Sequence, residues 1–192
     1  LGTLHASFLN CGAASLSGSC STDEYGDNFD IMGRGVAHFS ALRKEQKGWF
    51  DPSNIINVTA SGRYTIEPYE TATVGPKVLK IQRSVTSNPE LDDYLTVEYR
   101  QPIGFDSSLA GDAFQGALIH TLYLGPIFSI FTSLIDASPP ADKNTPTLKV
   151  GQTLLDPATR SSVTVVERTA AGLTMDVTIG KSDFILPTVT IT

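Results

Sequence analysis

The alternation of apolar and polar positions predicts β-strands along most of the chain after residue 55. Short runs alternate with a period of two and are separated by clusters of Gly, Pro, Asn and Asp, as strands joined by turns are. In YLTVEYR, for example, Leu, Val and Tyr fall on one side and Thr, Glu and Arg on the other. The predicted strands are Arg63–Glu67, Lys77–Arg83, Tyr94–Arg100, Ala117–Tyr123, Ser129–Ile135, Ser162–Arg168, Leu173–Ile179 and Ile185–Ile191. Seven or eight strands with irregular linkers predict an antiparallel β-sandwich.

One stretch has helical periodicity instead. In HFSALRKEQKGW (His38–Trp49), Phe39 and Leu42 are spaced i and i+3, charged residues occupy the other side, and Gly48 is a natural helix stop. We therefore expect a helix with an apolar inner side and a charged outer side. The Gly-, Ser- and Asp-rich residues before it predict a loop.

The stretch Gly116–Asp136 is the candidate for a membrane span. It contains His120, and Gly125-Pro126 interrupts it. Val, Ile, Phe and Thr are common around this break, so two buried strands joined by a turn fit better than a spanning helix. We therefore expect no membrane span.

Length and charge narrow the class of protein. The 192 residues allow one large domain or two modest ones with a sizeable core. The net charge is -6, from 20 acidic and 14 basic residues. No basic patch is present, which argues against a nucleic-acid partner. The composition changes near residue 50, from a loop rich in Gly, Ser and Asp with one helix to strand-like sequence, which suggests that the chain has two structural parts.

The chain has two cysteines, Cys11 and Cys20, which flank a loop rich in Gly, Ser and Ala. Their spacing matches neither a CxxC pair nor a zinc knuckle. In an oxidising compartment they would form a disulfide, and free buried thiols are the alternative. We expect the disulfide.

Two features of the first fifty residues point together to a metal site. One is the spacing from Gly2 to His5, and the other is the acidic loop YGDNFDIMGRG, which contains Met32. In metzincin peptidases the motif His-Glu-x-x-His-x-x-Gly-x-x-His is followed by a methionine-containing turn. The first two histidines bind zinc from one helix face, and the glutamate activates the zinc-bound water. The glycine lets the chain leave the helix, so that the third histidine reaches the metal.

The run LGTLHAS, CG, DEYGDNFDIMG and HFSALRKEQKGW resembles the region after the zinc helix in secreted gametolysin-like metzincin peptidases, over residues 1–50. The resemblance implies that His5 is a zinc ligand and Gly2 the helix exit. It makes Met32 the residue of the Met-turn, structural rather than a ligand. It also implies that two further zinc histidines and the catalytic glutamate precede Leu1, so that this chain alone is catalytically incomplete.

The strand-rich remainder resembles the domain that follows the catalytic region in these enzymes and in immune-inhibitor-A-like peptidases. The segments YLTVEYRQPIGFD, GALIHTLY, SLIDASPP and VGQTLLDPATRSSVTVVER occur in the same order. The implied fold is α+β, with a C-terminal piece of a zincin catalytic domain in residues 1–52 and an all-β sandwich in residues 53–192. The implied function is the C-terminal half of a secreted, extracellular zinc endopeptidase. Its partners would be the missing N-terminal half and a protein or peptide substrate, such as a cell-wall glycoprotein.

The sequence also allows other interpretations of these residues and of the function. His38 is expected at an exposed helix start and His120 inside a strand. Four loop acids are candidates for binding calcium or bracing the loop, although their spacing matches no EF-hand: Asp23, Glu24, Asp27 and Asp30. One alternative is a non-catalytic β-sandwich module for adhesion or carbohydrate binding, in which His5 has no role. Another is a degenerate peptidase homologue whose parent lacks the glutamate.

Overall fold

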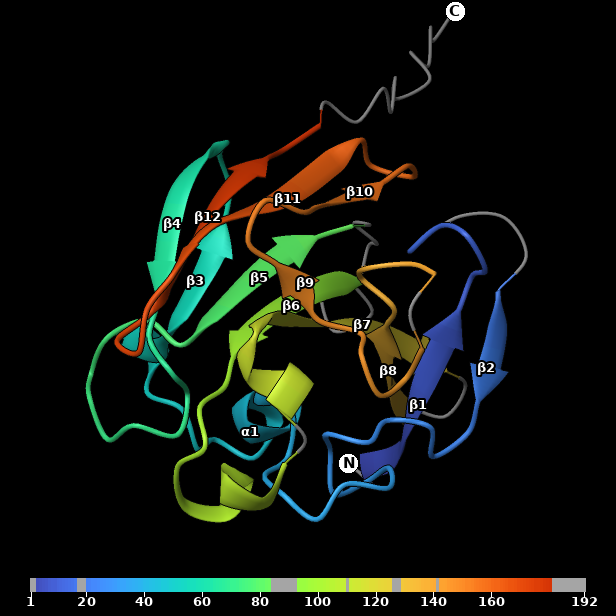
Figure 1. Ribbon diagram of the computed structural model, residues 1–192, viewed down its shortest axis with the longest axis horizontal. Helices are drawn as coiled ribbons and strands as arrows, with labels where there is room; N and C mark the ends of the chain where they lie inside the picture. The colour runs from blue at the N-terminus through green and yellow to red at the C-terminus, as the bar shows by residue number, and fades with distance from the viewer. Residues whose placement is uncertain are drawn as a thin grey trace, which may run out of the picture.

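The computed structural model describes residues 3–16, 20–83, 93–109, 111–125, 129–140 and 142–180. Within these residues the chain forms two β-sheets and one α-helix (Figure 1). The strand-rich character that the period-two pattern predicted is therefore confirmed. Gly2 and the expected strand Ile185–Ile191 lie outside the described residues.

The larger sheet has eight strands in the order β2-β1-β8-β7-β6-β5-β3, with β9 paired to β7. Their bounds are β1 (Thr3–Asn10), β2 (Ser21–Asp23), β3 (Ile55–Val58), β5 (Val78–Gln82), β6 (Tyr94–Tyr99), β7 (Gly116–Gly125), β8 (Ser129–Ile135) and β9 (Leu148–Lys149). β1 runs parallel to β8, and β3 runs parallel to β5. The expectation of a purely antiparallel fold was therefore wrong. Both parallel pairs are joined through long connections, and a parallel pairing requires such a crossover.

The smaller sheet consists of β4 (Gly62–Ile66), β10 (Thr153–Asp156), β11 (Ser161–Arg168) and β12 (Leu173–Thr178), all antiparallel. It lies over one face of the larger sheet (Figure 1). The two sheets share one core of buried apolar side chains, among them Leu79, Val97 and Ile119 from the larger sheet and Ile66, Val165 and Met175 from the smaller. Alternate residues of each strand enter this core, which explains the period-two pattern.

Seven of the predicted strands are confirmed, each to within two residues, as β4 to β8, β11 and β12. The stretch Gly116–Asp136 forms the antiparallel pair β7 and β8, as expected for two strands joined by a turn. In the described part of the chain, no helix has the length and apolar character needed to cross a membrane. Strands β1, β2, β3, β9 and β10 were not predicted.

The larger sheet includes strands from both sides of residue 52, where the composition had suggested a boundary. β1 pairs with β8 in a register that matches Ala6 with Thr132 and Leu9 with Ile135. The first 52 residues and the later residues therefore contribute to the same sheet. This pairing holds the segment that bears His5 on the later strands.

The second face of the larger sheet packs against non-strand segments. Phe29 from the loop before the helix and Ala113 from the 3-10 helix η4 (Gly111–Phe114) form a small core with Leu118 of β7 and Leu134 of β8. Helix α1 (Ala41–Gln46) packs on β6, where the Ala41 amide donates to Glu98 Oε2 at 2.5 Å. Loop and helix therefore cover a face that the sequence pattern marked as polar.

Helix α1 is shorter than the predicted helix His38–Trp49 and is oriented differently. It ends before Gly48, which has a φ of +67° and acts as the expected stop. Leu42 is buried as predicted, but the expectation that the charged side faces outward was wrong for two of its residues. Arg43 has no exposed surface and Lys44 is 8% exposed. Both are buried because the helix is packed between the sheet and the segment that contains Tyr69.

Candidate functional site

His5 lies near the start of β1 and is held by two side chains from the turn after β2. Its Nδ1 is 2.5 Å from Glu24 Oε1, and its Nε2 faces the hydroxyl of Tyr25. The carboxylate only accepts, so Nδ1 donates its proton to Glu24. The His5 side chain is 36% exposed and Glu24 69% exposed. The imidazole is thus held in one orientation by Glu24 and Tyr25.

The turn that brings Glu24 and Tyr25 over His5 has a specific backbone. Tyr25 adopts a φ of +60°, and the amide of Gly26 donates to the carbonyl of Asp23 at 2.9 Å. The tyrosine ring stacks on the imidazole with 3.7 Å between centroids. A positive φ is uncommon for a residue with a side chain, so packing on His5 must offset part of its strain.

The loop that contains Met32 lies directly against β1 beside His5. The Ala6 amide donates to the carbonyl of Met32 at 3.0 Å, and the Asp27 amide donates to the carbonyl of Ala6 at 3.3 Å. A side chain at Gly33 would overlap the Asp27 carbonyl and come within 2.9 Å of the Ala6 carbonyl oxygen. Only glycine fits this approach. The structure therefore places Met32 next to His5.

Two buried acids fix the Met32 loop. Asp30 Oδ1 accepts from the Met32 amide at 2.7 Å, and Oδ2 accepts from the Ser40 amide at 2.8 Å and lies 3.5 Å from Arg43 Nε. Arg43 also donates to the carbonyl of His5 and to Thr132 Oγ1, each at 3.0 Å. This arginine therefore connects the loop, β1 and β8. Burial lowers the pKa of Arg43, and the nearby Asp30 partly offsets that effect.

Asp27 forms the second buried contact. Its Oδ2 lies 3.0 Å from His120 Nε2, and neither side chain is exposed. Burial opposes the charge on His120, but the hydrogen bond and the charge of Asp27 outweigh it and raise the pKa of the imidazole. The expectation of His120 as an interior strand residue is confirmed. Asp27 and Asp30 are both fully buried and brace the loop from inside, which is one of the two roles considered for the loop acids.

The remaining sequence candidates lie in different surroundings. His38 precedes α1 and is half-buried, with its ring edge against Tyr69 and Phe105. The Cys11–Cys20 disulfide is present, as predicted. Across the residues that the structure describes, no three side chains of the types His, Cys, Asp or Glu form a group that could hold a metal ion. His5 is thus a single potential metal ligand, and Glu24 and Tyr25 hold its ring.

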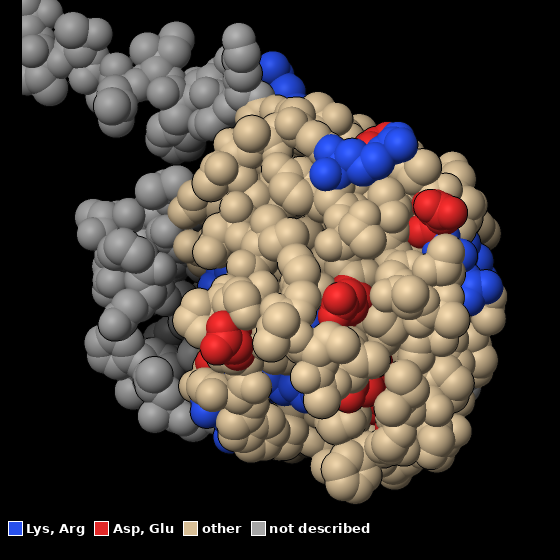
Figure 2. Space-filling view, turned by 90° about the vertical axis from the view of Figure 1, so that its left-hand side faces the viewer, with Lys and Arg blue, Asp and Glu red and all other residues tan. Residues whose placement is uncertain are grey.

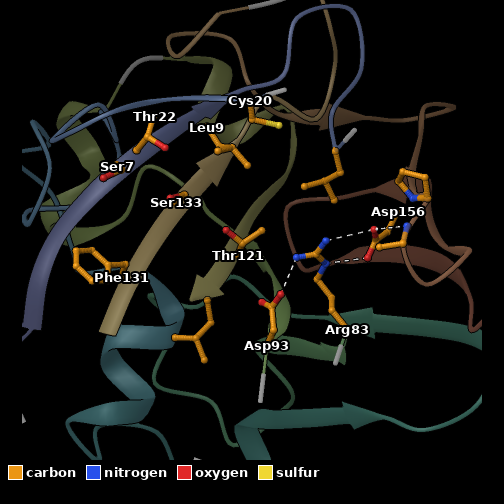
Figure 3. A pocket seen from close by; sticks show the side chains of 14 residues that line it. Ser7, Leu9, Cys20, Thr22, Arg83, Asp93, Thr121, Phe131, Ser133 and Asp156 are labelled. Atoms are coloured by element: carbon orange, nitrogen blue, oxygen red, sulfur yellow. Dashed lines mark hydrogen bonds and ion pairs between the residues drawn. The ribbon is translucent and has the colours of Figure 1, made fainter. Parts of the chain in front are cut away.

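A cavity of about 850 Å³ opens beside the larger sheet on the side of β1 and β8. The register aligns Ser7 of β1 with Ser133 of β8 and Ser133 with Thr121 of β7, so three hydroxyl side chains form a row across adjacent strands. On the opposite wall Arg83 donates to Asp93 and Asp156, each at 2.8 Å (Figure 3). The cavity therefore combines hydroxyls with an ion triad.

The contacts of His5 with Glu24 and Tyr25 and the burial of Arg43 were not anticipated from the sequence. The available signal was the dipeptide Glu24-Tyr25 before Gly26, which fits a turn.

The face of the molecule in Figure 2 has few charged side chains, and both signs of charge occur on it. No protein-family model, curated protein or solved structure matches this chain. Functional assignment therefore rests on the residues and their geometry.

Proposed function

We propose that this chain is the C-terminal part of a secreted, extracellular zinc endopeptidase in which His5 binds the catalytic zinc. The observation that carries the proposal is the backbone contact between Met32 and Ala6, the residue after His5. The motif requires a methionine loop beneath the third histidine, and the two segments are adjacent here. Residues 1–52 would then be the zincin piece, and β1 would join this piece to the sheet that the later strands form.

The surroundings of His5 fit one zinc ligand. A zinc-binding histidine usually donates its second ring N–H to a carboxylate, which fixes the tautomer and the ring orientation. Glu24 provides this contact at 2.5 Å and leaves Nε2 as the donor atom for a metal. Imidazole nitrogen is a preferred zinc ligand. The proposal takes the other two histidines and the general base from residues that precede Leu1.

Zinc supplies Lewis-acid activation of a water and of the scissile carbonyl when it is bound. The residues of this chain contribute orientation. Glu24 holds the His5 ring, Arg43 holds the His5 carbonyl, and the Met32 loop supports β1 from below. The substrate would be a protein or peptide, including a cell-wall glycoprotein, and the β-domain would help to dock it.

Zinc content and peptide hydrolysis of the protein expressed from its complete coding region test this proposal. We expect stoichiometric zinc in the wild type and loss of both zinc and hydrolysis in His5→Ala. Glu24→Gln should weaken zinc affinity by roughly 10- to 100-fold, because the imidazole loses its orienting carboxylate. His38→Ala is the matched control and should retain both properties. A complete protein without zinc, or an active His5→Ala variant that retains its zinc, would contradict the proposal.

A second function, a carbohydrate-binding module, is supported by the cavity of about 850 Å³. Its row of hydroxyls and its Arg83–Asp156 pair offer donors and acceptors side by side, as a sugar requires (Figure 3). Ser133→Val removes the central hydroxyl, and Ser162→Val changes a half-buried hydroxyl of β11 as a control. Affinity electrophoresis in soluble polysaccharides should show retardation of the wild type and the control, but not of Ser133→Val. Equal mobility of all three proteins would argue against this function.

A further inference from the structure

A second cavity, of about 530 Å³, lies between helix α1 and the segment that contains Tyr69. Its volume falls within the range of small-molecule sites. Five rings and one lysine form much of its wall: His38, Trp49, Phe50, Tyr69, Phe105 and Lys44. Trp49 and Phe105 are 59% and 73% exposed, which leaves an aromatic rim at the surface. Neither the zinc proposal nor the carbohydrate proposal involves this cavity.

Lys44 is the unusual group in this wall. It is 8% exposed, and its Nζ lies 3.8 Å from the centroid of the Tyr69 ring and 5.8 Å from that of Phe50. Within the described residues, the contacts of Nζ are with these two rings, and the nitrogen is not among the fully buried polar atoms that lack a partner. Removing an ammonium from most of its water is unfavourable, and contact with a ring replaces only part of the lost hydration.

Two of the carboxylates whose charges act on Lys44 are bound to other groups. Glu98 accepts from Arg100 Nε at 2.8 Å and from the Ala41 amide at 2.5 Å. Asp106 accepts from the His38 amide at 2.9 Å and lies 3.6 Å from Arg100. These acids moderate the charge of Lys44 but do not contact its ammonium. An acceptor for Nζ would therefore come from the cavity, either as water or as a group of a bound ligand.

Lys77, the other lysine in this wall, differs from Lys44 because its ammonium has acceptors within the protein. Its Nζ donates to the hydroxyls of Thr71 and Thr73, at 2.7 and 2.8 Å, and lies 3.4 Å from Glu67. Lys77 is therefore satisfied within the protein, and Lys44 is not. The cavity offers a ligand one cation that has no acceptor among the described residues of the protein and several ring faces, and the Asp51 carboxylate also lines it. This combination matches a single carboxylate on an aromatic body better than a phosphate, which needs more donors.

We propose that this cavity binds a small aromatic carboxylate, whose acid group pairs with Lys44 and whose ring packs among Tyr69, Trp49 and Phe105. The proposal does not depend on the peptidase function, because no zinc ligand lines the cavity.

The charge of Lys44 should also make ligand binding depend on pH, which provides a second test of the proposal. Burial lowers the pKa of Lys44 to about 8. The charged and titratable groups that act on it are Glu98, Asp106 and Glu70, which raise the pKa, and Arg100, which lowers it, with His38 also facing it. At pH 7 the ammonium is mostly present. At one pH unit above the pKa, the charged fraction of Lys44 falls to about a tenth. The ratio of the affinities for a carboxylate and for its neutral analogue should fall by about the same factor.

The test uses phenylacetate and its neutral analogue phenylacetamide as probes. Trp49 is the only tryptophan and lines the cavity, so its fluorescence reports binding. We expect phenylacetate to bind at least about tenfold more tightly than the amide at pH 7, and the difference to shrink at pH 9. Lys44→Met should abolish the difference while the melting temperature stays equal or rises. Lys47→Met, which changes an exposed lysine at the end of the same helix, should retain it.

Phe105→Ala provides a variant that leaves the core intact, because this ring is mostly exposed. It should weaken both probes by a similar factor and leave the preference for the acid unchanged. Equal affinity of the wild type for acid and amide would overturn the proposal. Persistence of the preference in Lys44→Met would also overturn it, as would the absence of saturable binding of both probes by fluorescence and calorimetry.

Discussion

Replacing Asp30 with asparagine should strongly destabilise the protein, because Asp30 is the buried anion that holds the Met32 loop against α1. The amide oxygen of Asn can still accept from the Met32 amide, which Asp30 binds at 2.7 Å. Its NH₂ group would then point at two donors, the Ser40 amide and Arg43 Nε. Asp30→Asn therefore removes one charge-assisted hydrogen bond and the only carboxylate within 4 Å of Arg43 among the described residues.

The expected loss follows from these contacts. A hydrogen bond to a charged group contributes about 1.5–3 kcal/mol. Removal of one partner of a buried ion pair destabilises by about 3–5 kcal/mol in all, since it leaves the other charge uncompensated. Arg43 keeps its two bonds to the His5 carbonyl and Thr132. We therefore expect the lower part of this range, about 3 kcal/mol.

Urea unfolding, followed by Trp49 fluorescence and circular dichroism in non-reducing buffer, measures this loss. Asp176→Asn is the matched control, because Asp176 pairs with Arg63 at 2.7 Å on the surface, where 47% and 61% of the two side chains are exposed. An exposed pair of this kind contributes little to the free energy of unfolding, because water and salt screen it. Unfolding free energies that fall equally in the two variants would refute the role assigned to burial. Amide exchange at Met32 should also accelerate in Asp30→Asn only.

Three further outcomes are expected. Reduction of Cys11–Cys20 should lower the free energy of unfolding by about 2.7 kcal/mol on the loop-entropy relation for a loop of about ten residues, and a loss near zero in urea unfolding would contradict that relation. The pKa of His120 is raised in the folded state, so its contribution to stability is complete below the ordinary value of 6.5 and is lost as pH rises through the raised value. Urea unfolding against pH should show that slope in the wild type but not in His120→Gln. The pKa of Lys44 is lowered from 10.5 to about 8, so the free energy of unfolding should rise with pH between these values, and Lys44→Met should remove this rise.

Much of the strand pattern could be predicted because each strand buries alternate residues in the shared core. β8 has the bounds that the sequence predicted, Ser129–Ile135. β1 was missed because its sequence, TLHASFLN, was interpreted as the exit from a zinc helix, and its partner β8 is more than 100 residues away. Such pairing depends on long-range packing, which local alternation does not encode.

The candidate site was predictable only in outline. The order of His5 and Met32 suggested that they meet, and their segments do. The orientation of the His5 ring depends on the positive φ of Tyr25, which no local pattern specifies. The burial of Lys44 depends on Tyr69, which is 25 residues further along the chain. Contacts between distant segments therefore determine the chemistry of both sites.

The position of zinc in crystals of the protein produced from its complete coding region tests the central claim most directly. An anomalous difference map collected at the zinc edge should show one strong peak about 2.0–2.1 Å from His5 Nε2, the distance of a zinc–histidine bond. Glu24 should stay on Nδ1, and the Tyr25 hydroxyl should move away from Nε2. A peak at other residues with His5 unligated, or no zinc peak at all, would contradict the account.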